Sequence, residues 1–207
     1  MTSFYDGISR YFKPAELEMI KSIKIGIAGA GGLGSNCAMN LVRSGFQNFV
    51  IADFDTIDGS NLNRQFYFSN QRGFLKVDAL KQNLLKINPS LSLTTIKERI
   101  TVNNLEQIFG ECDCIVEAFD DAQAKKLLIE HFSNSTKLVV AASGIAGCGN
   151  TDRIKTRKIN SRLYIIGDFV SESSEQLPPY SPCVTIAAAK QADVILSHAI
   201  NLVMQTD

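Results

Sequence analysis

The chain has 207 residues, of which 45% are hydrophobic and 20% are charged, with 21 Lys and Arg against 21 Asp and Glu. This length fits one large domain, and the composition is typical of a globular protein rather than a disordered or fibrous one. Proteins that bind polyanions over a broad surface usually carry an excess of basic residues. The zero net charge therefore argues against nucleic acid as a partner.

The five cysteines are odd in number and form no C-x-x-C pair. This pattern argues against a disulfide framework and against a zinc site, and it indicates a reducing compartment. The N-terminus has no continuous apolar segment, and no run of about 20 apolar residues could span a bilayer. We therefore expect a cytoplasmic protein with no zinc and no membrane partner.

Predicted helices and strands alternate along most of the chain. In chain order we predict a helix at 15–22, a strand at 23–28, a helix at 33–44, a strand at 46–53, a helix at 76–87, a strand at 91–97, a helix at 103–109, a strand at 112–119, a helix at 122–132 and a strand at 137–143. The strands are apolar runs without strict alternation. This pattern indicates an α/β protein with a mainly parallel sheet and helices on both faces.

The pattern changes near the C-terminus. Segments 152–159 and 162–169 alternate and are joined by Asn160-Ser161, which predicts an antiparallel hairpin. A polar, proline-containing loop at 171–182 precedes a final apolar helix at 184–204.

A glycine-rich motif, GAGGLG at 29–34, directly follows the first predicted strand and opens a helix. Its glycines are Gly29, Gly31, Gly32 and Gly34. Such glycines permit close approach of phosphates to backbone N–H groups, and an acidic residue after the second strand, here Asp53, can accept from ribose hydroxyls. The same glycines could serve only tight strand-to-helix packing. The motif alone does not separate NAD from an adenine mononucleotide.

The segment after Asp53 favours nucleotidyl transfer. Asn61, Arg64 and Gln65 stand at i, i+3 and i+4, so a helical turn would place them on one face. Nucleotidyl transfer develops charge on the phosphates, which fixed Arg and Lys donors stabilise. Lys76, at the start of a predicted helix, is the natural second cation, although a lysine there could also be a solvated surface residue.

Two aspartates, Asp120 and Asp121, end the strand at 112–119. The carboxyl ends of parallel strands meet at one edge of a sheet, so these residues should converge with Gly29 and Asp53. A carboxylate there could hold Mg²⁺ on a triphosphate, and we assign that role to Asp120. The competing interpretation is that either aspartate only caps the following helix.

The ordered runs GAGGLGS, IADFDTIDGSNLNRQ and EAFDD, with Lys76 between the last two, resemble the ThiF/MoeB/HesA family, relatives of the ubiquitin-activating enzymes. The resemblance extends from about Ile23 to the final helix. It implies a Rossmann-like fold and an ATP-dependent adenylyltransferase that activates the C-terminal Gly-Gly carboxylate of a small ubiquitin-like protein and releases pyrophosphate. It also implies catalytic roles for Arg64, Lys76 and Asp120, phosphate contacts for Gly31 and Gly32, a ribose contact for Asp53, and nucleotide contacts for Asn61 and Gln65.

The chain also departs from many members of that family, because it lacks their two zinc-binding C-x-x-C pairs and their longer C-terminal region. It is most similar to the short form of ThiF, whose partner is the thiamine sulfur carrier ThiS. The resemblance therefore implies a ThiS-like carrier, a sulfur-donor protein and a homodimer, with Arg10 the nearest match to the family's cross-subunit arginine. Some relatives use a late cysteine for a sulfur or thioester step. Cys183 stands in that place, although it could simply be a small apolar residue that begins the final helix.

We therefore predict one ThiF-type adenylyltransferase domain over residues 1–207. It comprises a helical segment at 1–22, a nucleotide-binding core at 23–145, and antiparallel strands, loop and final helix at 146–207. Three alternatives stay open. An NAD(P)-binding oxidoreductase or redox sensor would share the glycine motif and Asp53, but the chain has no second domain and no Tyr-x-x-x-Lys pair. The others are a non-catalytic carrier-binding module and ATP-dependent activation of a modified tRNA base, which the zero net charge disfavours.

Overall fold

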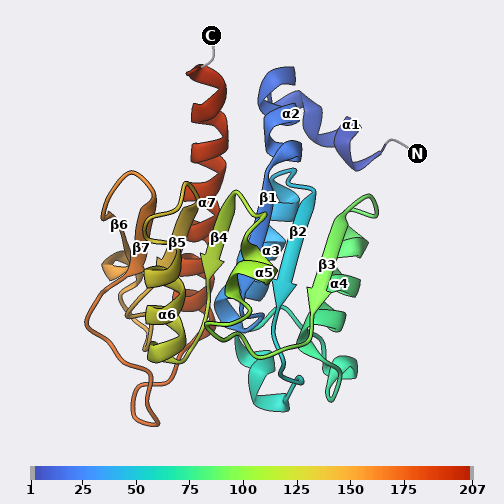
Figure 1. The fold of residues 1–207 in the computed structure, drawn as a ribbon. Helices are drawn as coiled ribbons and strands as arrows, with labels where there is room; N and C mark the ends of the chain where they lie inside the picture. Colours follow the sequence, from blue (N-terminus) through green and yellow to red (C-terminus); the bar gives the residue numbers. More distant parts are fainter. Residues whose placement is uncertain (1–2, 206–207) are drawn as a thin grey trace.

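A seven-stranded sheet forms the centre of the computed structural model, which describes residues 3–205 (Figure 1). The strand order is β3-β2-β1-β4-β5-β7-β6, and all neighbouring strands are parallel except β6 and β7. The strands are β1 (Lys24–Ala28), β2 (Asn48–Ala52), β3 (Ser92–Ile96), β4 (Cys114–Glu117), β5 (Leu138–Ala142), β6 (Lys155–Lys158) and β7 (Leu163–Gly167). The predicted fold, mainly parallel with an antiparallel C-terminal hairpin, is confirmed.

Helices cover both faces of this sheet (Figure 1). They are α1 (Phe4–Ile8), α2 (Pro14–Ser22), α3 (Gly32–Arg43), α4 (Lys76–Ile87), α5 (Leu105–Phe109), α6 (Ala122–Phe132) and α7 (Ser181–Met204). Apolar residues of α3, α4 and α7 share one core with one face of the sheet, while α5 and α6 pack on the other face. The central strands are buried on both sides, which explains why their sequences are apolar runs rather than alternating ones.

The final helix, α7, is long and apolar enough to suit a membrane span by length and composition. In the fold, however, it packs along α3 and against β5 and β7, and its alanines Ala187, Ala188 and Ala192 are buried. These small side chains allow close packing on α3. The helix begins at Ser181, before the predicted start at 184, because Pro182 is tolerated in a first turn.

Two other boundaries differ from the prediction. The helix α1 lies within the predicted helical segment at 1–22 but was not predicted as a separate element, and β6 begins only at Lys155 because Thr151–Arg153 forms a 3-10 turn, η4. In α1, Ser3 and Asp6 form a reciprocal capping box that supports so short a helix.

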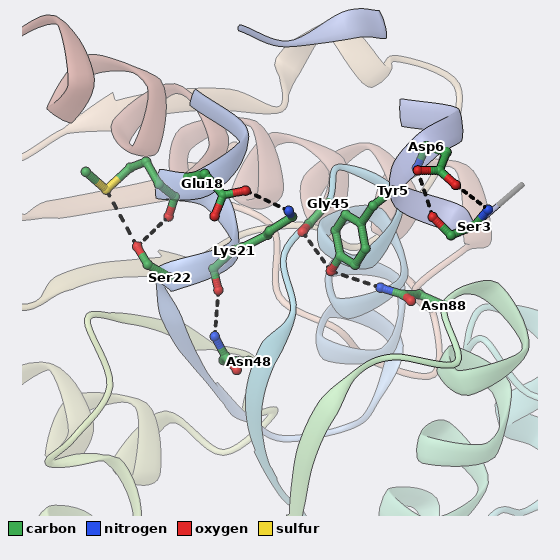
Figure 2. A network of polar contacts seen from close by, with 10 residues as sticks. Ser3, Tyr5, Asp6, Glu18, Lys21, Ser22, Gly45, Asn48 and Asn88 are labelled. Carbon is green, nitrogen blue, oxygen red and sulfur yellow. Dashed lines mark hydrogen bonds and ion pairs between the residues drawn. The ribbon is translucent and has the colours of Figure 1, made fainter. Parts of the chain in front are cut away.

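The N-terminal helices lie at the amino ends of the parallel strands (Figure 1), and Figure 2 shows the polar contacts that they make there. The Tyr5 hydroxyl donates to the Gly45 carbonyl (3.4 Å) and accepts from the Asn88 side-chain amide (3.1 Å), and these partners lie in the segments that lead into β2 and β3. Asn48, the first residue of β2, donates to the Lys21 carbonyl at 2.6 Å. These bonds hold α1 and α2 at the edge of the sheet opposite the carboxyl ends of the strands.

Candidate nucleotide site

The sheet has a topological switch point between β1 and β4. From β1 the chain runs outward through β2 and β3, then crosses to β4 and continues in the opposite direction. In open α/β sheets, this divergence opens a crevice beyond the carboxyl ends of the strands. Gly29 follows β1, Asp53 follows β2 and Asp120 follows β4, so the topology brings all three to this edge.

The glycine motif forms the turn between β1 and α3. Gly29 has a φ of 99°, and a Cβ there would lie 2.8 Å from the Ala118 carbonyl oxygen. A Cβ at Gly34 would clash with the Gly29 carbonyl, so both glycines are needed for packing as the competing interpretation states. In addition, Gly31 is the N-cap residue of α3, and no side chain caps the helix there. The free N–H groups of this first turn are suited to an anionic phosphate.

Asp53 ties the glycine motif to the end of β2. Its Oδ2 accepts from the Ala30 N–H at 2.6 Å, and its Oδ1 accepts from the Asp55 N–H at 2.8 Å. Burial raises the pKa of Asp53, while these N–H groups and the charge of Lys76 act in the opposite direction. Each carboxylate oxygen can accept a second hydrogen bond, which leaves capacity for a ribose hydroxyl.

Lys76 begins α4 as predicted, but its surroundings are not those of a solvated lysine. The residue is 7% exposed, and its Nζ lies 2.6 Å from Asp55 Oδ2. Tyr67, which was not predicted, joins this helix to the glycine motif: its buried hydroxyl lies 2.7 Å from the Ala30 carbonyl oxygen and 3.3 Å from that of Lys76. Lys76 is therefore a partly desolvated cation held at the carboxyl edge of the sheet.

The predicted helical turn over Asn61, Arg64 and Gln65 is present in part, because the N–H groups of Arg64 and Gln65 both donate to the Asn61 carbonyl, at 3.2 and 3.0 Å. The local helix is a short 3-10 turn, η2 (Gly59–Asn63), and Arg64 leaves it with a φ of −153°. Asn61 stays inside the turn, where its side-chain oxygen accepts from the Asp58 N–H at 3.0 Å. Its amide nitrogen has no partner among the described residues.

The first turns of α3 hold the segment that follows η2. The Asn36 side chain donates to the Arg64 carbonyl at 2.8 Å, and the Ser35 hydroxyl accepts from the Phe66 N–H at 3.0 Å. Side-chain contacts from α3 thus hold the end of this turn and the residues after it. Both polar residues directly follow the glycine motif in sequence, which is the signal that could have revealed them.

These contacts bring Arg64 and Gln65 against the glycine motif. A Cβ on Gly32 would lie 3.5 Å from Arg64 Cγ, and a Cβ on Gly31 would lie 3.9 Å from Gln65 Nε2. Gln65 is 9% exposed, and its Oε1 has no hydrogen-bond partner within residues 3–205. Arg64 Nη1 donates to Asn63 Oδ1 at 2.7 Å, which leaves other guanidinium N–H groups for a ligand. A buried polar atom without a partner points to a bound group.

The two aspartates after β4 have different surroundings. Asp121 caps α6, because its Oδ1 accepts from the Ala124 N–H at 2.7 Å. Asp120 is exposed, and its carboxylate has no partner in the described part of the chain. No group of three or more metal-ligating side chains occurs among the described residues. A single free carboxylate fits Mg²⁺ that is held mainly by phosphates and water.

Arg10 and Cys183 do not join this cluster. Arg10 lies in the exposed 3-10 turn η1 (Ser9–Tyr11), beside the amino ends of the strands and so at the edge opposite its own site. Cys183 lies in the first turn of α7, is fully buried, and has the Arg153 guanidinium 3.9 Å from its sulfur. Its thiol has no solvent-accessible surface in this conformation.

The fold and this edge of the sheet define an α/β protein of the Rossmann-like class, in which an arginine and a desolvated lysine stand at an edge suited to the phosphates of a nucleotide. Residues 7–196 match the ThiF family, and the chain belongs to that family. The predicted resemblance is confirmed.

Named relatives and a solved structure agree with the family assignment. The chain is 32% identical over 149 residues to SUMO-activating enzyme subunit 2 of Dictyostelium discoideum, covering 71% of this chain and 22% of that protein. It is 35% identical over 127 residues to the adenylyltransferase and sulfurtransferase UBA4 of Candida glabrata, covering 61% and 29%. The chain thus spans about a quarter of the length of these relatives. The fold matches E. coli tRNA N6-threonylcarbamoyladenosine dehydratase in complex with ATP, with a TM-score of 0.82, 20% identity, and 98% and 94% of the two chains covered.

Proposed function

We propose that this chain is an ATP-dependent adenylyltransferase that activates the C-terminal carboxylate of a small carrier protein. A carboxylate oxygen attacks the α-phosphorus of ATP, the bond from that phosphorus to the bridging oxygen of the β-phosphate breaks, and pyrophosphate leaves. The products are a carrier acyl-adenylate and pyrophosphate. The observation that carries the proposal is the meeting of Arg64, the unpartnered amide oxygen of Gln65 and the uncapped first turn of α3 at the glycine motif.

In this proposal each polar group of the site has a separate role. The N–H groups at the start of α3 cradle phosphate oxygens, and Asp53 accepts from the ribose. Arg64 and Lys76 stabilise the charge that develops as the pyrophosphate separates, and the burial of Lys76 strengthens its effect. Mg²⁺ would neutralise further phosphate charge, and Asp120 would help to hold this ion on the triphosphate. The carrier's carboxylate is itself the nucleophile, so the step requires no nucleophile from the enzyme.

The family resemblance supports a more specific assignment. The carrier would be ThiS-like, with a Gly-Gly terminus, and a separate sulfur-donor protein would consume the acyl-adenylate in thiamine thiazole biosynthesis in the cytoplasm. A homodimer would let Arg10 act in the partner's site. Its exposure, and its place at the edge opposite its own site, leave it free for that use.

The test is exchange of labelled pyrophosphate into ATP, measured with a panel of Gly-Gly-terminated carriers. We expect exchange with a ThiS-like carrier and none when its terminal carboxylate is amidated, because the amide cannot attack phosphorus. Unfractionated tRNA is the matched alternative substrate. Exchange that depends on tRNA rather than on a carrier, or tight NADH binding without ATP binding, would overturn the assignment, and carrier binding without exchange would identify a binding module.

A further inference from the structure

The segment 118–121 joins β4 to α6 and carries Asp120. It is held at both ends: the Phe119 N–H donates to Glu117 Oε1 at 2.8 Å, and Asp121 caps α6. Its inner side touches the glycine motif, since a Cβ on Gly29 would lie 2.8 Å from the Ala118 carbonyl oxygen and 3.5 Å from the Phe119 ring. A shift of this segment would therefore move Asp120 relative to the phosphate-binding turn.

Glu117, the last residue of β4, is completely buried and carries a carboxylate. Its Oε2 accepts from the Lys125 Nζ of α6, and this ammonium also donates to the Ala142 carbonyl at the end of β5 (2.7 Å). Burial raises the pKa of Glu117, and Lys125 opposes that effect. Both carboxylate oxygens are bound by the chain itself, and the side chain has no solvent-accessible surface through which a nucleotide or metal could reach it.

A third element fixes the same point from the opposite face of the sheet. Gln191 of α7 is fully buried, and its Nε2 lies 3.1 Å from the Glu117 carbonyl oxygen and 3.2 Å from that of Val140 in β5. Glu117 is thus tied to β5, α6 and α7. A buried ion pair contributes little net stability compared with apolar packing, so its place at the root of this segment requires another reason.

We propose that Lys125 and Glu117 are positioning residues for Asp120. Lys125 binds one oxygen of Glu117, the other oxygen holds the Phe119 N–H, and together they set the path of 118–121 that aims the Asp120 carboxylate at the metal on the triphosphate. This inference rests on the metal-binding role of Asp120 in the proposed function. Lys125 touches neither substrate nor metal and acts only through Glu117 and the segment.

The test measures ATP binding by calorimetry with Mg²⁺ and with EDTA, so that its readout does not depend on turnover. In the wild type we expect Mg²⁺ to tighten ATP binding. Lys125→Met should reduce that tightening by about 10-fold, the usual scale for an outer-shell residue, while leaving binding in EDTA nearly unchanged. Lys125→Arg, which keeps the charge, should retain most of it. The matched control is Lys126→Met, the next residue on α6, whose side chain is 74% exposed and should have no effect.

Two further variants separate the possible failures. The double variant Glu117→Gln/Lys125→Met leaves no unpaired buried charge, so it should fold even if Lys125→Met does not. Mg²⁺ should tighten its ATP binding only weakly, because the ion pair that joins Glu117 to α6 is gone. Full tightening in this double variant would overturn the positioning role. If Asp120→Asn keeps full tightening, the metal role within the proposed function fails. If Asp120→Asn loses tightening while both Lys125 variants keep it, only the present inference fails.

Discussion

At the amino ends of the parallel strands, polar side chains are engaged with the chain itself, whereas at the carboxyl ends several are not. Tyr5, Asn48 and Asn88 bind backbone or side-chain partners and hold the N-terminal helices in place. At the other edge, Gln65 Oε1 and the Asp120 carboxylate have no partner among the described residues. Since buried polar groups are ordinarily paired, the unpaired Gln65 oxygen supports the proposal that the carboxyl edge binds a ligand, while the amino edge maintains the fold.

The largest effect on activity is expected at the carboxyl edge, from a substitution of Arg64. We expect Arg64→Ala to reduce carrier-dependent pyrophosphate exchange by about 100-fold or more, because it removes a fixed donor to developing charge. Its melting temperature should stay close to that of the wild type, since the side chain is partly exposed. Arg43→Ala is the matched control, because Arg43 is exposed at the other end of α3. Equal losses in both variants would contradict the division of the two edges.

The glycine motif offers the next largest effect. Gly34→Ala places a Cβ against the Gly29 carbonyl, and we expect a loss of about 1–3 kcal/mol in the free energy of unfolding together with weaker ATP binding. Gly7→Ala, in α1, meets nothing within 4 Å and should be neutral or stabilising by up to about 1 kcal/mol. Urea unfolding and calorimetric ATP titration measure both quantities. Unchanged ATP affinity in Gly34→Ala would argue against phosphate binding at this turn.

A substitution at the amino edge should change stability without changing function. The fully buried Asn88 donates to the Tyr5 hydroxyl and accepts from the Ser90 N–H at 3.0 Å. We expect Asn88→Ala to lower the free energy of unfolding by about 1–3 kcal/mol, the cost of leaving buried groups unpaired. The dissociation constant for ATP should not change. A large loss of ATP affinity at a temperature where the variant is folded would show that the amino edge takes part in ATP binding.

The smallest effect concerns pH. Burial raises the pKa of Asp53 above its ordinary 3.8, so the folded protein keeps this proton to higher pH than the unfolded chain. Its contribution to stability is therefore full below the unfolded pKa and declines as pH rises through the folded pKa. Asp58 has the opposite sign, because Ser60 N–H and hydroxyl groups lower its pKa, and its contribution is lost as pH falls. We expect opposite changes in Asp53→Asn and Asp58→Asn in the slope of the free energy of unfolding against pH. Urea unfolding at a series of acidic pH values measures this slope.

Local sequence signals were sufficient where an element is defined by its own residues. The bounds of α4 and α6 agree with the prediction, since Asn88-Pro89 ends one and Asp121 caps the other. The helical turn predicted over Asn61, Arg64 and Gln65 forms only in part, because the regular helix ends at Asn63 and side chains of α3 hold the residues that follow. Tyr67 and Lys125 carry no motif, and the EAFDD run that contains Glu117 gives no sign of its ion pair, because the partners of these residues lie far away in sequence or on another element.

The sequence by itself determined the alternation of strands and helices, the glycine turn, the family and the residue types of the site, because these depend on local periodicity and ordered motifs. Only the tertiary structure decided which aspartate after β4 is free, that Lys76 is desolvated beside Asp55, and that a buried Glu117–Lys125 pair lies beneath Asp120. The physical reason is that hydrogen bonding and desolvation depend on which groups share space, and the crossing of the chain at the β1–β4 switch point sets that arrangement.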